Sequence, residues 1–366
     1  MPDNISPAQP IHYFMQKLKL HLLRAAVALA GFVMSTAYAQ YGNLGFTQLP
    51  QLDGGKISLF CPTLAPEAPV RQGPFDFSWA ADAPPSLGNG RLIVISHGSG
   101  GSPWVHMDLT RILVSRGFTV AFPQHQGDNY LNHSSPGPES WARRPLEVSR
   151  AIDAVASYPP LSNLLTTDRV GVFGGSAGGH TALSLAGGEW SPARFKAHCE
   201  KHLQEDFSSC VGFTTLLRGN ALDGLKRWLA RQIIAWRFSD PTPHRDSDSR
   251  IKAAVAMVPF AADFDPASLT TPRIPLGLVI ASKDVNQVPQ FHAEAVAKLC
   301  EPRCEILMRL PEAGHGAMLS PMPPLEPESI AHALLSDPPG FDRATVVPAI
   351  HQSIADFFAQ HLLPEP

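Results

Sequence analysis

The chain has 366 residues, of which 44% are hydrophobic and 17% are charged, which is enough to bury the core of one large domain. Its formal net charge is -3, so the chain does not have the strong positive charge of proteins that bind nucleic acids or anionic membranes. Composition therefore excludes a disordered chain and indicates a compact globular protein with no nucleic-acid partner.

The first 39 residues have the layout of an export signal. Lys17, Lys19 and Arg24 precede a short apolar run over residues 25–35, and the small residues Ala37 and Ala39 follow at the positions that a signal peptidase reads. The apolar run has about 11 residues, whereas a membrane span needs roughly 20. No stable membrane anchor is expected, although an uncleaved anchor or a buried helix is the alternative interpretation.

This layout predicts cleavage between Ala39 and Gln40 and a periplasmic or secreted mature protein of residues 40–366. Translation from Met15 would leave the same signal intact.

Five cysteines are compatible with an oxidising compartment. Cys199 and Cys210 flank a polar stretch, and Cys300 and Cys304 flank a turn, so pairing within each couple is favoured, although a sequence cannot prove connectivity. Cys61 lies in a strand-like apolar run, where a free thiol packs as a small hydrophobe. No cysteine or histidine spacing resembles a zinc site, and neither a metal nor a cofactor is expected.

Strand-like and helix-like segments alternate along most of the chain. Strands are expected over residues 57–61, 75–79, 92–96, 119–122, 170–173, 253–258, 276–281 and 305–310. Helices are expected over residues 105–116, 145–158, 177–186, 288–299 and 347–362, with Pro145 in a first turn. This order predicts an α/β protein with a mostly parallel sheet and helices on both faces.

The alternation stops between about residues 187 and 250, which predicts an insertion that forms a cap above the sheet. Within it, a helix is expected over residues 222–236. Its apolar side chains recur at helical spacing, at Leu222, Leu225, Leu229, Ile233 and Trp236. We favour a stripe that packs on the core over a lid or membrane-surface helix, with Trp228 or Trp236 as candidate apolar walls of a pocket.

The strongest motif is G-x-S-x-G over residues 174–178, with a buried strand before it and a helix after it. In that context a sharp turn exposes the serine hydroxyl at the edge of the sheet. Ser176 is therefore the candidate nucleophile, whereas an incidental serine in a glycine-rich turn is the weaker interpretation.

A serine nucleophile needs a base and a supporting acid, which follow it in the order acid and then histidine in this arrangement. His315 lies in a small-residue loop after the last strand, and Asp284 follows the strand over residues 276–281. Asp263 and Asp265 compete for the role of the acid, because some hydrolases place it one strand earlier.

The tetrahedral intermediate of such a reaction needs N–H donors for its oxyanion. The Ala177 N–H, at the start of the helix, is one candidate. The second is expected in the loop over residues 97–101, with the Ser99 N–H preferred and Gly100 as the alternative. His97 is expected to be structural, and the loop lacks the lysine and spacing of phosphate-binding motifs.

Several segments together resemble the bacterial predicted dienelactone hydrolases, which are relatives of the plasma-type platelet-activating-factor acetylhydrolases. They are LIVISHGSGG, GFTVAFPQHQGDN, RPLEVSRAID, VGVFGGSAGGHTAL, ASKDVNQVP and AGHGAM. The resemblance covers roughly residues 90–320 and implies an α/β-hydrolase fold with metal-free hydrolysis of carboxylic esters. Two departures leave the substrate open: Ser176 stands where true dienelactone hydrolases have cysteine, and the strand over residues 253–258 ends without the acid that the acetylhydrolases place there.

The leading hypothesis is a serine esterase for short to medium acyl esters, acting through an acyl-enzyme on a small-molecule substrate. An amidase or peptidase on the same fold, or a catalytically silent binding protein, are the alternatives. Four residues are expected near the site without an assigned role, namely Trp104, His125, Asp128 and Trp141.

Overall fold

The computed structural model describes residues 41–51 and 54–364. The expected export signal over residues 1–39 and its cleavage before Gln40 lie outside the described residues. Within the described ranges, no helix combines the length and the apolar composition needed to cross a membrane.

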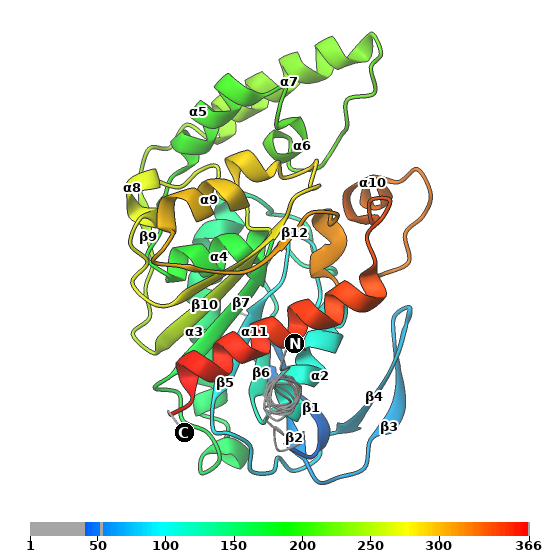
Figure 1. The fold of residues 1–366 in the computed structure, drawn as a ribbon, viewed down its shortest axis with the longest axis vertical. Helices are drawn as coiled ribbons and strands as arrows, with labels where there is room; N and C mark the ends of the chain where they lie inside the picture. Colours follow the sequence, from blue (N-terminus) through cyan, green and yellow to red (C-terminus); the bar gives the residue numbers. More distant parts are fainter. Residues whose placement is uncertain (1–40, 52–53, 365–366) are drawn as a thin grey trace, which may run out of the picture. The chain divides into compact units, whose positions relative to one another are not determined.

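A ten-stranded sheet forms the centre of the described chain (Figure 1). In spatial order its strands are β12 (Glu305–Leu310), β11 (Leu276–Ala281), β10 (Ile251–Met257), β7 (Val170–Gly175), β5 (Leu92–Ser96), β6 (Thr119–Pro123), β2 (Lys56–Thr63), β1 (Asn43–Pro50), β4 (Phe75–Ala81) and β3 (Ala68–Gln72). The series from β12 to β6 pairs in parallel, whereas β2 is antiparallel to β6 and β1 is antiparallel to β2. This is the mostly parallel sheet that the sequence predicts.

Helices cover both faces of the sheet, and each face has its own hydrophobic core (Figure 1). One core includes side chains of α3 (Pro138–Ala156), α4 (Ala177–Leu185) and α9 (Ala293–Cys300). The other includes side chains of α2 (Met107–Ser115) and α11 (Arg343–Leu362). Because both faces are covered, every residue of β5 is buried, as its continuous apolar run predicts.

Shorter helical pieces connect these elements. They are η1 (Pro103–His106), η2 (Pro159–Leu161), α8 (Pro266–Leu269), η3 (Pro289–Phe291), η4 (His315–Met318) and α10 (Ile330–Leu335).

The expected strands over residues 92–96, 276–281 and 305–310 are confirmed to the residue. The predicted start of α3 is wrong, because the helix begins at Pro138 and Pro145 lies inside it. Pro145 has no N–H to donate to the carbonyl four residues earlier, but burial of its neighbours on the sheet outweighs that local loss. The predicted helix over residues 288–299 is a short η3 followed by α9, which begins only at Ala293.

The region between α4 and β10 contains α5 (Pro192–His202), α6 (Phe207–Cys210), α7 (Leu222–Arg237) and a small sheet of β8 (Glu189–Trp190) and β9 (His244–Arg245). Helix α7 spans the expected residues, but the prediction that its apolar stripe packs on the core is wrong. Leu225 is 54% exposed and Trp236 is 80% exposed, while only Asp223, Ala230 and Ile234 are buried. The helical pattern is present, but its apolar stripe lies on a face that no other element of the described chain covers.

The cysteine pairing is confirmed in the described chain. Cys199 is bonded to Cys210, which joins α5 to α6, and Cys300 is bonded to Cys304 after α9. Cys61 is a buried free thiol on β2, and burial raises its pKa to about 11.

Candidate active site

Ser176 occupies the sharp turn between β7 and α4. Its backbone has φ 53°, a left-handed conformation that is unfavourable for a residue with a side chain. The flanking glycines leave no room for anything larger, because a Cβ on Gly174 would lie 1.9 Å from the Gly178 oxygen and a Cβ on Gly178 would lie 1.8 Å from the Ser96 oxygen. The turn therefore depends on both glycines and directs the serine into a pocket.

The structure brings Ser176, His315 and Asp284 together at this turn. His315 Nε2 lies 3.1 Å from Ser176 Oγ, and His315 Nδ1 lies 2.6 Å from Asp284 Oδ2. The other carboxylate oxygen of Asp284 accepts hydrogen bonds from the N–H groups of Asn286 and Gln287, at 2.9 and 2.8 Å. All three side chains are buried, and these contacts hold the imidazole between the hydroxyl and the carboxylate.

The two competing carboxylates lie elsewhere. Asp263 Oδ2 is 3.0 Å from Nε2 of His180, a residue of α4, and both side chains are fully buried. Asp265 caps α8 and forms an ion pair with Arg194. Of the three carboxylates weighed from the sequence, Asp284 is the one that contacts His315.

Gln287 is a site residue that the sequence did not single out. Its Oε1 accepts a hydrogen bond from Ser176 Oγ at 3.1 Å, and its Nε2 donates to the Val258 carbonyl at 2.8 Å. Val258 has φ 40°, an outlier for a β-branched residue at the carboxyl end of β10. The Ser176 hydroxyl has one proton, so Gln287 and His315 are alternative acceptors for it. No pattern marks a single glutamine in a loop, so only its position three residues after Asp284 could have drawn attention to it.

The expected oxyanion donors, Ser99 and Ala177, both line the pocket beside Ser176. Asp128 holds the loop that contains Ser99, because its Oδ1 accepts hydrogen bonds from the Ser99 hydroxyl at 2.6 Å and from the Gly100 N–H at 3.0 Å. The N–H of Gly100, the alternative donor, therefore already has a hydrogen-bond partner in Asp128. The Ser99 and Ala177 N–H groups have no hydrogen-bond partner within residues 41–51 and 54–364.

A buried ion pair between Arg144 and Asp128 holds the loop that contains Ser99 in place. Arg144 of α3 lies 2.8 Å from the second carboxylate oxygen of Asp128 and also donates to the His97 carbonyl. Burial opposes ionisation of Asp128, but Arg144 and the hydroxyls of Ser99 and Ser140 hold its pKa well below its usual range. Asp128 therefore stays ionised and fixes the loop, a role that the sequence left unassigned.

His125 belongs to the same buried layer. Its ring lies 2.8 Å from Ser96 Oγ and 2.6 Å from Glu147. Burial, followed by the charge of Arg144, holds the pKa of His125 well below its usual value, while burial raises that of Glu147. The neutral imidazole contacts Ser96, the last residue of β5, and does not line either pocket next to Ser176.

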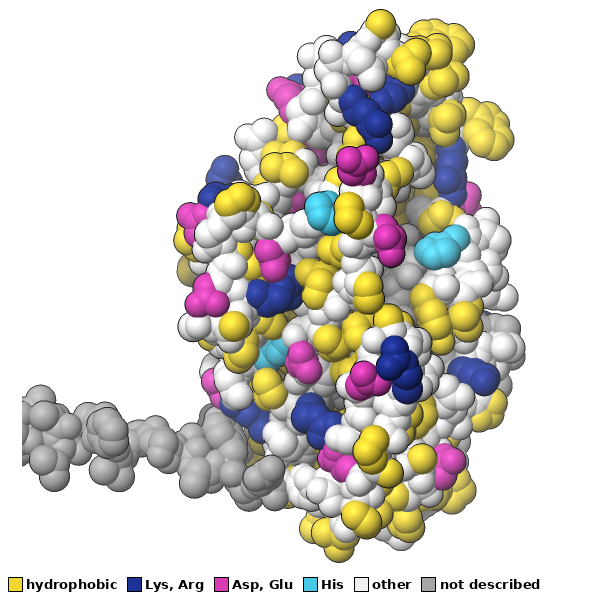
Figure 2. All heavy atoms as spheres, turned by 90° about the vertical axis from the view of Figure 1, so that its right-hand side faces the viewer, with side chains coloured by type: hydrophobic (Ala, Val, Ile, Leu, Met, Phe, Trp, Pro, Cys, Tyr) yellow, Lys and Arg dark blue, Asp and Glu magenta, His cyan; other side chains and the backbone are white. Residues whose placement is uncertain are grey.

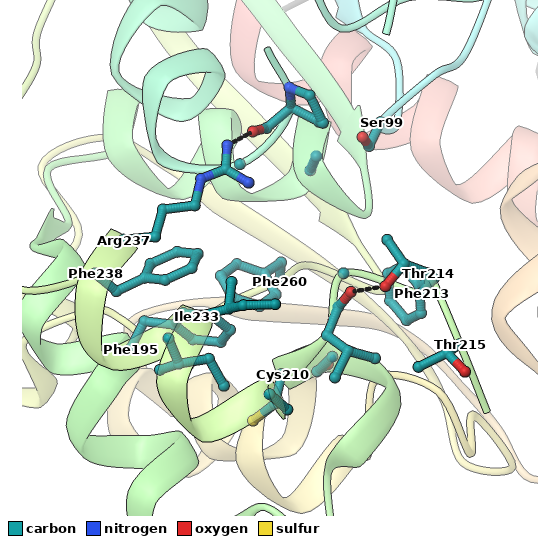
Figure 3. A pocket seen from close by; sticks show the side chains of 18 of the residues that line it. Ser99, Phe195, Cys210, Phe213, Thr214, Thr215, Ile233, Arg237, Phe238 and Phe260 are labelled. Atoms are coloured by element: carbon teal, nitrogen blue, oxygen red, sulfur yellow. Dashed lines mark hydrogen bonds between the residues drawn. The ribbon is translucent and has the colours of Figure 1, made fainter. Parts of the chain in front are cut away.

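Two pockets meet at Ser176. The first has a volume of about 440 Å³ and is lined by Trp141 of α3 and by side chains from α5 to α7; the second has about 360 Å³ and is lined by Trp104, His315 and Met318. Ser99, Ser176 and Phe213 border both. In Figure 3 three aromatic rings and Ile233 face the first pocket opposite the Phe213 to Thr215 segment, at Phe195, Phe238 and Phe260.

Trp228 and Trp236 line neither of these pockets, so the prediction that one of them forms a pocket wall is wrong. The walls from α7 are instead Leu229, Ala230, Ile233 and Ile234.

One group of side chains within the described chain has the proximity of metal ligands, at His198, Asp206 and Cys210. Cys210 is already bonded to Cys199, which removes the thiolate a metal would need. Asp206 Oδ2 lies 2.9 Å from both His198 Nε2 and His292 Nε2, so the group forms a hydrogen-bond network between the α5–α6 region and the segment before α9.

Comparison with known proteins gives a family and a fold. A model described as the alpha/beta hydrolase family matches residues 93–333. A ferulic acid esterase from Streptomyces cinnamoneus has a similar structure, with a TM-score of 0.57 and 17% identity over 91% of this chain and 94% of that chain. No curated protein sequence matches. The superfamily and its fold are thereby confirmed, while the narrower resemblance to dienelactone hydrolases stays a prediction.

Proposed function

The chain belongs to the alpha/beta hydrolase family, and on that premise we propose that it hydrolyses carboxylic esters of small molecules with Ser176 as the nucleophile. The observation that supports this most is the continuous contact from Ser176 Oγ through the His315 ring to Asp284, at 3.1 and 2.6 Å. The same family includes many activities. A ferulic acid esterase, by its name an enzyme for an ester, shares the fold, which makes esters the first class to test.

In the proposed mechanism, His315 Nε2 takes the proton of Ser176 Oγ as that oxygen attacks the ester carbonyl. Asp284 keeps the Nδ1 proton of His315 in place and stabilises the imidazolium. The Ser99 and Ala177 N–H groups are the proposed donors to the oxyanion. His315 then protonates the departing alcohol, and a water molecule, activated by the same imidazole, releases the acid and restores Ser176.

The two pockets offer separate spaces for the two halves of an ester, since both open on Ser176. Each added buried CH₂ contributes roughly 0.8 kcal/mol only until a pocket is full. We therefore propose a preference for short to medium acyl groups. The region over about residues 187–250 would act as a cap that limits their length, since residues from α5 to α7 line the larger pocket.

The mechanism is tested by labelling and by substitution. A fluorophosphonate should label Ser176, and Ser176→Ala should lose both labelling and at least about 10⁴-fold in kcat on p-nitrophenyl esters. His315→Ala should fall to a similar level, because these residues act as a unit. Full turnover by Ser176→Ala would refute the proposal, and faster turnover of anilides than of esters would make the protein an amidase.

The proposed role of Asp284 as the supporting acid can be tested against Asp263, a second buried carboxylate of the chain. Asp284→Asn should lower kcat by roughly 10³- to 10⁴-fold with the fold retained. Asp263→Asn removes a buried carboxylate that contacts His180 and not His315, so its kcat should change far less. The reverse result would place the acid on Asp263.

We also propose that the protein is exported and that its mature chain begins at Gln40. The two disulfides are compatible with an oxidising compartment. N-terminal sequencing of the protein from a periplasmic or culture fraction should read from Gln40, and intact residues 1–39 on a cytoplasmic protein would contradict the proposal.

A further inference from the structure

Helix α7 has a broad apolar face that nothing in the described chain covers. Its members are between 44% and 80% exposed, at Leu222, Leu225, Trp228, Leu229, Ile233 and Trp236. They recur every three or four residues, so they form one continuous stripe along the helix. Figure 2 shows hydrophobic side chains gathered at the top of the view, where Figure 1 places α7, beside Lys and Arg side chains. Monomeric proteins rarely expose a contiguous patch of this kind unless it meets a partner.

The charges of α7 indicate what the partner is. The helix has four basic residues and one acid, Asp223, which is buried and bonded to Lys226. Arg237 forms an ion pair with Glu139, but Arg227 and Arg231 form no ion pair within residues 41–51 and 54–364. This helix is thus locally cationic in a chain whose net charge is -3, and it complements an anionic surface.

The apolar face is also continuous with the larger pocket. Leu229 and Ile233 are exposed on the face and line the pocket that contains Ser176. A flat partner on α7 would therefore lie beside the mouth of the pocket.

We propose that α7 docks the protein on an anionic lipid surface, with its apolar stripe in the headgroup region and Arg227 and Arg231 near the lipid phosphates. Amphipathic helices with aromatic and leucine side chains on one face and basic residues on the other bind in this way, parallel to the surface. Docking does not depend on which residue is the nucleophile, so it stands apart from the proposed hydrolysis.

Vesicle co-sedimentation of the Ser176→Ala protein tests this, because that variant cannot consume lipid. It should bind vesicles of phosphatidylcholine with 30% phosphatidylglycerol, bind pure phosphatidylcholine more weakly, and lose part of its affinity as NaCl rises. Leu225→Ser combined with Trp228→Ser and Trp236→Ser should weaken binding at least tenfold, since three large apolar side chains no longer enter the lipid. None of these three residues lines a pocket next to Ser176.

Two further variants separate the contributions. Arg227→Gln and Arg231→Gln should each lower binding to the anionic vesicles about fivefold and leave binding to neutral vesicles unchanged. Leu64→Ser with Leu87→Ser, which removes exposed leucines elsewhere, is the matched control and should bind normally. Hydrolysis of soluble p-nitrophenyl acetate by the same variants in the Ser176 background reports the proposed function separately.

The proposal is overturned if the Ser176→Ala protein does not bind the anionic vesicles, or if the triple serine variant binds as well as its parent. It is also overturned if sedimentation velocity shows a stable dimer that the triple variant converts to a monomer, because α7 would then be an interface between two copies.

Discussion

Helices α3 and α7 are both amphipathic, but their surroundings differ. Helix α3 has 19 residues and buries most of one side, including Trp141, Val148 and Ile152. Helix α7 has 16 residues and buries only Asp223, Ala230 and Ile234. The apolar side chains of α3 pack on the sheet, whereas most of those of α7 face outward.

The difference follows from what each helix connects. Helix α3 links β6 to β7, which lie in one parallel sheet on either side of β5, so the crossover must return across a face of that sheet. Helix α7 lies between α6 and the small strand β9, and neither belongs to the central sheet. Amphipathic periodicity shows that a helix has an apolar side, while the strands around it decide whether the protein itself covers that side.

The largest expected contrast between the two helices is in their arginines. Arg144 of α3 is fully buried against Asp128, so Arg144→Met should leave a buried carboxylate without its partner and lower the free energy of unfolding by about 3–5 kcal/mol. Arg231→Met on the exposed side of α7 should change it by less than about 0.5 kcal/mol. Urea unfolding of both variants measures the difference, and equal losses would show that α7 is covered in solution.

An isoleucine on each helix gives a second contrast with identical chemistry. Ile152 of α3 is fully buried, and Ile152→Ala should lower the free energy of unfolding by about 2–5 kcal/mol through lost burial and the cavity left behind. Ile233 of α7 is 54% exposed, so Ile233→Ala should cost less than about 1 kcal/mol. A loss above about 2 kcal/mol for Ile233→Ala, measured by the same unfolding curves, would contradict the burial assigned to α7.

The same reasoning explains what the sequence could predict. Ser176, Asp284 and His315 each follow a strand that the sequence predicts, and parallel strands end at one edge of the sheet. Their meeting could therefore be predicted. The start of α3 could not, because Pro145 resembles a first-turn proline until the burial of the residues before it is known.

Contacts that depend on the direction of a side chain could not be predicted from the sequence. Gln287 accepts from Ser176 while its amide donates to the carbonyl of Val258, whose backbone conformation no residue pattern indicates. The outward face of α7 was the weaker of the two interpretations from the sequence, since a stripe at helical spacing looks the same whether a sheet or another partner covers it.

A histidine on a covered helix face should also make the free energy of unfolding depend on pH, whereas one on an uncovered face should not. This pH dependence is the smallest of the expected effects. His351 lies on the covered side of α11, where burial, together with the charge of Arg343, lowers its pKa to about 4 although Asp108 acts in the opposite direction. An unfolded histidine titrates near 6.5. Between these two values the unfolded chain binds a proton that the folded chain does not, so stability is lost as the pH falls below about 6.5.

One such histidine contributes a slope of about 1.4 kcal/mol per pH unit over that window. His351→Gln should therefore reduce the slope of the free energy of unfolding against pH between pH 6.5 and 4.5. The reduction should be at most the slope that one bound proton contributes. His332→Gln, which removes an exposed imidazole on α10, is the control for the loss of a histidine that the fold does not bury. Urea unfolding at half-unit pH steps measures both slopes. Equal slopes for His351→Gln and the parent protein would mean that protonation of another group causes the loss of stability in acid. His106, whose pKa burial lowers to about 3, is the next histidine to test.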